Sequence, residues 1–72
     1  MKNAIGPTIR KLRLSQRTRV TQEDLAGRLA VSGISIDRSA IARIEKGERH
    51  VLDIEALAIA KAFRVPIEQL FV

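Results

Sequence analysis

Apolar positions recur at helical spacing along the whole chain. Ile5, Ile9 and Leu12 repeat at i, i+4 and i+7, which is the spacing of one buried helix face. Gly6-Pro7 suits a helix start, because proline at the first helical position has no N–H to leave unpaired. The pattern therefore predicts a first helix that runs through about residue 15.

A second helix is predicted after the polar connection SQRTRV. In TQED, the Thr21 hydroxyl can accept from the Asp24 N–H while the Asp24 carboxylate reaches back, which is a capping box. The helix is expected to end near Ala30, before a break built around Gly33. Its apolar face consists of Leu25, Ala26 and Leu29.

The segment DRSAIARIEKGER predicts a third helix that begins after Asp37 as the N-cap and ends at Gly47. At about 100° per residue, Ile44 and Glu45 fall on opposite sides of Ile41, and the buried direction of the helix lies between them. The outer face carries Ser39, Ala42, Arg43 and Lys46, with Arg38 in the exposed first turn.

This outer face has two possible interpretations. Small residues let a helix approach a partner closely, and an arginine fork fits guanine bidentately; the same face can also be an ordinary solvated surface. Glu45 lies on the inner side, where an unpaired carboxylate is costly. We expect Glu45 to pair with Arg13, the alternative being a hydrated position at the rim of the core.

Two further helices complete an all-α pattern. Asp53 is predicted to cap a fourth helix that runs to about Phe63, and Pro66 to start a short fifth helix. The expected inner face of the fourth helix is Leu52, Ala56, Ile59, Ala60 and Phe63. That of the fifth is Ile67, Leu70 and Phe71. Residues 1–72 are therefore predicted to form a single domain, a compact five-helix bundle.

Composition excludes several classes of protein. The 72 residues include no cysteine, which excludes disulfides and cysteine-ligated zinc and suits a reducing cytosol. No apolar run approaches the ~20 residues of a membrane span, and MKNAIGPTIR lacks the apolar core of a signal peptide. We expect a cytoplasmic protein without a membrane partner.

The net charge of +5 is unevenly distributed. Residues 1–20 carry six basic and no acidic side chains, residues 21–50 carry five of each, and residues 51–72 carry two basic and three acidic. A basic first third suggests a face that meets a polyanion, although a solvated basic helix has the same composition.

Catalysis has little support in the sequence. The one histidine, His50, has no cysteine or second imidazole to act with, and Glu23 and Asp24 suit a helix start for dipole reasons. We therefore expect no enzyme activity, no catalytic residue, no metal and no cofactor.

The motifs TQEDLAGRL, RSAIARIEKGER and VPIEQLF together resemble the helix-turn-helix domain of phage repressors and Cro proteins, the xenobiotic-response-element type. The resemblance covers about residues 5–71. It implies a lambda-repressor-like domain whose third helix enters the DNA major groove while the second crosses the backbone.

The resemblance also implies roles for individual residues. Thr21 and Gln22 would lie at phosphate, as would Lys46 after the third helix. Base edges would be met by Arg38, Ser39 and Arg43, with Ala42 beside a thymine methyl. The pair of Arg13 and Glu45 would be structural, and Arg17 and Arg19 would either bind phosphate or remain solvated.

Two features depart from this pattern or extend it. About five extra residues within VSGISID lengthen the turn before the third helix, and Val31, Ile34 and Ile36 suggest that this insertion packs on the domain. Ile54 and Leu57 form a second apolar set, which either packs on a neighbouring segment or joins Phe71 and Val72 in a dimer patch.

The sequence therefore predicts a double-stranded DNA-binding transcriptional regulator. We expect a cytoplasmic, nucleoid-associated repressor that acts as a homodimer. The alternative is a protein-interaction module, such as the antitoxin of a toxin–antitoxin pair, with a protein partner.

Overall fold

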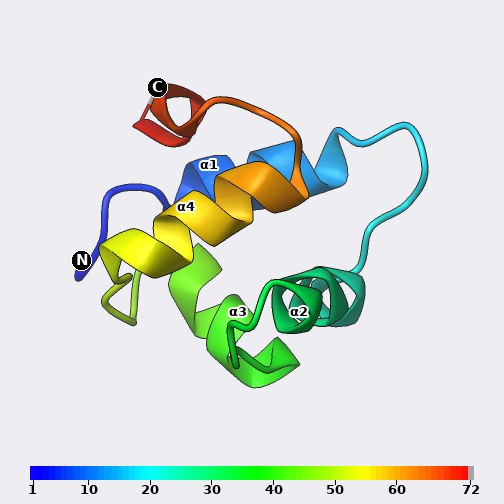
Figure 1. The fold of residues 1–72 in the computed structure, drawn as a ribbon. Helices are drawn as coiled ribbons and strands as arrows, with labels where there is room; N and C mark the ends of the chain where they lie inside the picture. The colour runs from blue at the N-terminus through cyan, green and yellow to red at the C-terminus, as the bar shows by residue number, and fades with distance from the viewer. Residues whose placement is uncertain (72) are drawn as a thin grey trace.

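The computed structural model describes residues 1–71, and all of its regular structure is helical (Figure 1). The all-α prediction is confirmed, with the difference that the fifth helix is a 3₁₀ helix. Val72, predicted for the apolar patch, lies outside the described residues. The elements are α1 (Gly6–Leu14), α2 (Gln22–Val31), α3 (Arg38–Glu45), α4 (Asp53–Ala62) and the 3₁₀ helix η1 (Ile67–Phe71).

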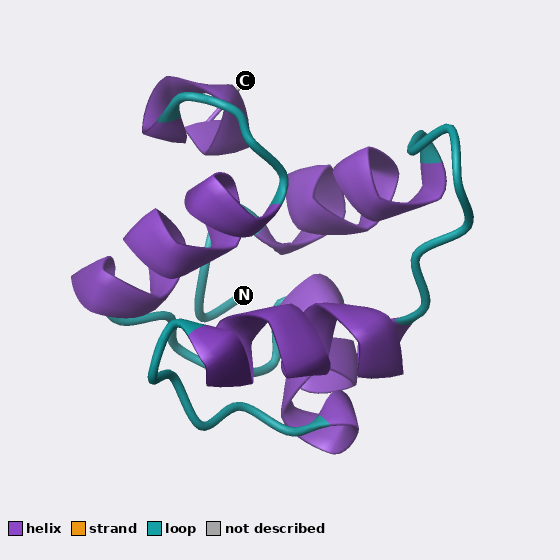
Figure 2. Ribbon diagram, turned by 45° about the vertical axis from the view of Figure 1, so that its right-hand side comes forward, coloured by secondary structure: helices purple, strands orange, loops and turns teal. Residues whose placement is uncertain are grey.

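The helices surround one core. In Figures 1 and 2, α2 and α3 lie together at one end of the molecule and η1 lies at the other end. α2 packs against both α3 and α4, while α1 bridges α3 and η1. The largest fully buried side chains come from all five elements: Ile9, Leu25, Leu29, Ile41, Ile44, Ile59 and Leu70.

The predicted caps of α2 and α3 are confirmed. The Asp24 N–H donates to the Thr21 hydroxyl at 3.0 Å, and the Thr21 N–H donates to the Asp24 carboxylate at 2.9 Å. Both bonds lower the pKa of Asp24, and the bond from the Thr21 backbone has the larger effect. Asp37 accepts from the Ala40 N–H at 2.8 Å.

The prediction that Asp53 caps α4 is wrong by one position. Leu52 is the N-cap and Asp53 is the first helical residue. The Leu52 N–H donates to the Glu55 carboxylate at 2.9 Å, so a side chain within the first turn satisfies the helix start.

Three predicted core side chains are instead exposed: Leu52 at 58%, Phe71 at 65% and Val31 at 91%. An N-cap backbone is not helical, so Leu52 leaves the stripe that it matched in sequence. In a 3₁₀ helix, side chains three residues apart align, so Leu70 shares the direction of Ile67 and Phe71 points away from it. The extended turn packs on the core through Ile36 and half-buried Ile34, without Val31.

Three helices end in the same hydrogen-bonded motif, with one unusual residue. After α2, α3 and α4, paired N–H groups return to the last turn, which is the Schellman arrangement. The residue in the left-handed conformation is Gly33 (φ 81°) or Gly47 (φ 75°) after α2 and α3, but Arg64 (φ 57°) after α4. A side chain in this conformation is strained.

We predict that Arg64→Gly raises the free energy of unfolding by about 1 kcal/mol, because glycine removes the left-handed penalty. For a domain of this size that is about 4–8 °C in Tm, measurable by thermal and urea unfolding. The converse control is Gly33→Ala, where an added Cβ meets nothing within 4 Å, so only the backbone penalty acts. The prediction fails if Arg64→Gly lowers Tm or if Gly33→Ala is neutral.

Candidate nucleic-acid interface

One face of α3 is free of internal bonds. Arg38, Ser39 and Arg43 are exposed, and so is Lys46 directly after the helix. Within residues 1–71, these four side chains make no hydrogen bond or ion pair. Ala42 lies half-buried between them. The outer face predicted from the sequence is therefore available to a partner.

The inner face of α3 is anchored by the carboxylate of Glu45. Arg13 donates to it through both Nε at 2.8 Å and Nη2 at 3.0 Å. The Gln22 side-chain amide donates to the same carboxylate at 3.0 Å. The three donor groups belong to Arg13 on α1 and Gln22 on α2, so the buried carboxylate of Glu45 joins three helices.

Arg13 is held firmly in its charged form. The hydrogen bond to Glu45 raises the pKa of Arg13, and the Coulombic attraction of the pair adds to this. A further bond at 3.1 Å runs from Arg13 Nη1 to the Val20 carbonyl. Arg13 therefore also fixes the connection that leads into α2.

The end of α3 is held by the first residues of the chain. The Asn3 amide donates to the carbonyls of Ile44 at 3.1 Å and Arg49 at 2.8 Å, and the Lys2 N–H donates to the Gly47 carbonyl at 2.8 Å. A Cβ at Gly6 would collide with the Ile44 carbonyl, so α1 and α3 meet backbone to backbone.

A basic hollow of about 510 Å³ adjoins α3 and the start of α2. It brings together five residues predicted for DNA contact: Arg19, Thr21, Gln22, Arg38 and Lys46. Glu23 is the one acidic residue in its lining. Thr21 and Gln22 are half-buried, and one amide N–H of Gln22 is already bonded to Glu45. We call this the α3 hollow.

Arg10 also lines the α3 hollow, although it was not among the predicted site residues. The basic first third of the chain pointed to a polyanion, but charge counting does not show which cations share a face. Arg10 precedes Arg13 by one helical turn, and that spacing was the available signal. Arg17, predicted together with Arg19, lines a different hollow.

A second depression, of about 330 Å³, lies on the Arg43 side of α3. Its cations include Lys2 and Arg49, neither of them predicted as site residues. Arg49 is fixed there by Glu55, through Nη1 at 3.0 Å and Nη2 at 3.1 Å. Glu48 and Glu55 also line this depression. The exposed face of α3 therefore has a strongly basic hollow on one side and a depression of mixed charge on the other.

Residues 1–71 contain neither a cluster of metal ligands nor a helix suited to a membrane. No group of three or more histidine, aspartate or glutamate side chains is arranged to hold a metal ion. No helix in the same range is long and apolar enough to cross a membrane.

Two packed helices, α2 and α3, with an outward face free of internal bonds on the second helix and cations beside it, form the arrangement by which helix-turn-helix domains dock on DNA. A family model described as HTH_3, helix-turn-helix, matches residues 9–70. The chain therefore belongs to this family and is a phage repressor/Cro-type DNA-binding regulator of transcription. No curated protein and no solved structure matches it significantly.

We predict that Glu45→Gln lowers the free energy of unfolding by about 2–3 kcal/mol, because the amide leaves the partly buried guanidinium of Arg13 without its counter-charge. Urea unfolding measures this difference. The matched control is Glu48→Gln, an exposed position three residues later, which should change stability by less than about 0.5 kcal/mol. Equal stability of both variants would show that the pair contributes nothing.

We also predict a pH-dependent contribution from Glu55. The bonds from Arg49 lower the pKa of Glu55 most, and the bond from the Leu52 N–H lowers it further. A lowered folded-state pKa stabilises the fold above the unfolded value, about 4.3, and this stabilisation is lost as the pH falls through the folded-state pKa.

Glu55→Gln should therefore be less stable than the wild type at pH 7, with the difference shrinking below about pH 4. Urea unfolding at a series of pH values measures this. Glu68→Gln, at an exposed position, is the control and should follow the wild type throughout. A difference that stays constant down to pH 2 would contradict the linkage.

Proposed function

We propose that the chain is a sequence-specific repressor that binds duplex DNA as a homodimer, with α3 in the major groove. The exposed face of α3, free of internal bonds and continuous with the α3 hollow, carries this proposal. An α-helix with its side chains is about 10–12 Å across, which fits a major groove about 12 Å wide.

Base reading is assigned to the side chains at the start and centre of α3. Arg38 and Arg43 offer forks for guanine O6 and N7, and Ser39 offers a hydroxyl. Ala42, small and half-buried, leaves room for a thymine methyl beside it. Because these side chains have no internal partner, binding to bases breaks no bond of the fold.

Phosphate binding is assigned to the α3 hollow. Arg19 and Lys46 supply charge there, Arg10 adds to it, and the start of α2 directs N–H groups towards the same region. Gln22 serves the fold through Glu45 and retains a second amide N–H for phosphate. Such contacts make affinity depend on salt.

The homodimer is assigned to the exposed apolar surface of α4. Ile54 is 57% and Leu57 is 54% exposed, which favours the dimer patch over packing on a neighbouring segment. Exposed apolar side chains next to each other favour a second copy as partner. Such a dimer would span two successive major grooves and would repress transcription where its operator overlaps the binding site of RNA polymerase.

The test is selection of bound duplexes from a random DNA pool near physiological salt, with wild type and Arg43→Ala in parallel. We expect a two-fold-symmetric motif with half-sites about one helical turn apart, and loss of preference at one position per half-site with Arg43→Ala. A single unsymmetrical site would remove the dimer. No enrichment from folded protein would remove sequence-specific DNA binding.

Lys46→Ala provides the matched comparison for phosphate contact. It should weaken binding to all duplexes alike and reduce the salt slope by about one unit, as measured by fluorescence anisotropy over a range of salt concentrations. Equal loss on every sequence with Arg43→Ala would instead assign Arg43 to phosphate.

A further inference from the structure

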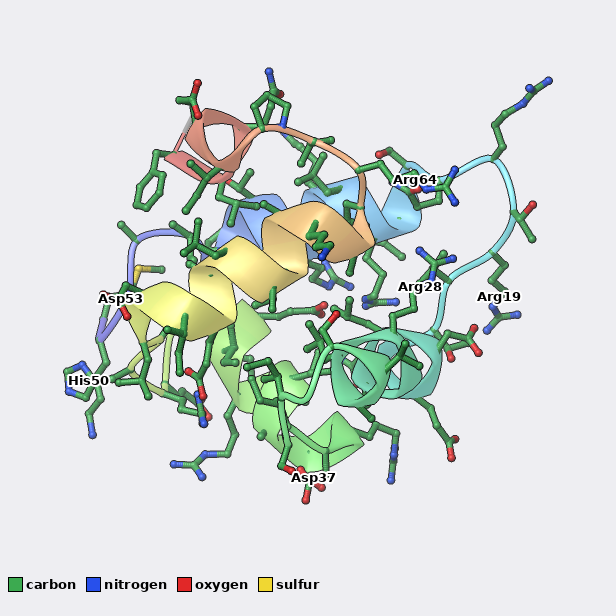
Figure 3. All side chains as sticks on the ribbon, in the orientation of Figure 1. Arg19, Arg28, Asp37, His50, Asp53 and Arg64 are labelled. Atoms are coloured by element: carbon green, nitrogen blue, oxygen red, sulfur yellow. The ribbon has the colours of Figure 1, made fainter. Side chains whose placement is uncertain are left out.

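A hollow of about 580 Å³ is separate from the α3 hollow. It lies at the C-terminal end of α2, whereas the α3 hollow lies at the N-terminal end. No residue of α3 lines it. In Figure 3, Arg28 and Arg64 lie on one side of the molecule and His50 on the opposite side, with Asp37 at the end formed by α2 and α3.

The lining of this hollow is strongly basic. Arg17, Arg28 and Arg64 contribute to it from three different segments, and none of its nine lining residues is acidic. Arg28 Nη1 donates to the Ala62 carbonyl at 3.2 Å, which joins the ends of α2 and α4. The side chains of Arg17 and Arg64 make no hydrogen bond or ion pair within residues 1–71. We call this the arginine hollow.

Arg64 occupies its place at a cost to the fold. It has the left-handed conformation that glycine adopts after α2 and α3. Glycine would remove the strain at this position but would also remove the guanidinium group from the hollow. Strained residues that persist in a fold are concentrated at binding sites. The strain at Arg64 and its place in the lining therefore both favour a binding role for its side chain.

Apolar surface accompanies the charge. Val31 is 91% exposed at the hollow, and Val20 and Phe63, both nearly buried, also line it. A phosphate backbone would match the arginines but would leave Val31 in water. A peptide that carries both carboxylates and an apolar side chain matches both features.

We propose that the arginine hollow binds an acidic segment of a partner protein, with carboxylates on Arg17 and Arg64 and an apolar side chain against Val31. This function goes beyond DNA binding and does not depend on it. Arg28, already bonded to Ala62, adds charge and holds the two helix ends together.

The experiment is selection of random peptides displayed on phage against the wild-type protein, with counter-selection on the double variant Arg17→Ala/Arg64→Gly. This variant keeps the Arg28–Ala62 bond, and Arg64→Gly relieves strain, so loss of binding cannot be attributed to unfolding. We expect enriched peptides with Asp or Glu beside Leu, Ile or Phe. Each single variant should weaken a selected peptide about fivefold.

The location of the bound peptide is tested by amide chemical shifts of the labelled protein. Titration with a selected peptide should shift Val31, Phe63 and Arg64, and Arg38→Ala/Lys46→Ala should bind it as the wild type does. Shifts concentrated at α3 would overturn the proposal, as would selection without acidic enrichment.

DNA is tested as the alternative occupant of the arginine hollow by measuring the duplex affinity of Arg17→Ala/Arg64→Gly over a range of salt concentrations. An unchanged salt slope supports a protein partner, whereas a slope reduced by about two units would make the hollow a phosphate site and overturn the proposal. Because the peptide selection contains no DNA, its result is independent of whether the chain reads an operator.

Discussion

The arrangement of α3 and its outer face depends on one buried carboxylate. Glu45 is 5% exposed and receives two bonds from Arg13 and one from Gln22. A buried charge is tolerated only when its hydrogen bonds are satisfied, and these donors reach Glu45 only when α1 and the start of α2 are correctly placed. Because Glu45 lies on α3, the same bonds set the direction in which the outer face of α3 points.

Other contacts around α3 complete this support without using its outer face. Asn3 bonds the carbonyls of Ile44 and Arg49, and Arg49 is bonded in turn to Glu55 on α4. Ile44 itself is in the core. Every neighbouring element therefore constrains the inner side of α3 or its end, and the cations of the two flanking hollows are positioned relative to a fixed helix.

The sequence predicted local structure, such as helix caps, more accurately than it predicted which side chains from different helices line the same hollow. The caps at Thr21 and Asp37 follow from side-chain chemistry within four residues, so spacing alone identifies them. Leu52 was misplaced because helical periodicity does not extend to an N-cap residue. Arg10 and Arg17 show the larger difficulty: which arginines share a hollow depends on how α1, α2 and α4 pack, and this information is not local in the sequence.

The lack of internal bonds on the outer face of α3 has an evolutionary consequence. Arg38, Ser39 and Arg43 can be replaced by other polar residues without cost to the core, because stability resides in Glu45, Ile41 and their neighbours. Exposed substitutions usually change stability by less than about 0.5 kcal/mol. In the proposed function, sequence preference can thus diverge after gene duplication while the scaffold stays constant, and these three positions are where new specificity would be encoded.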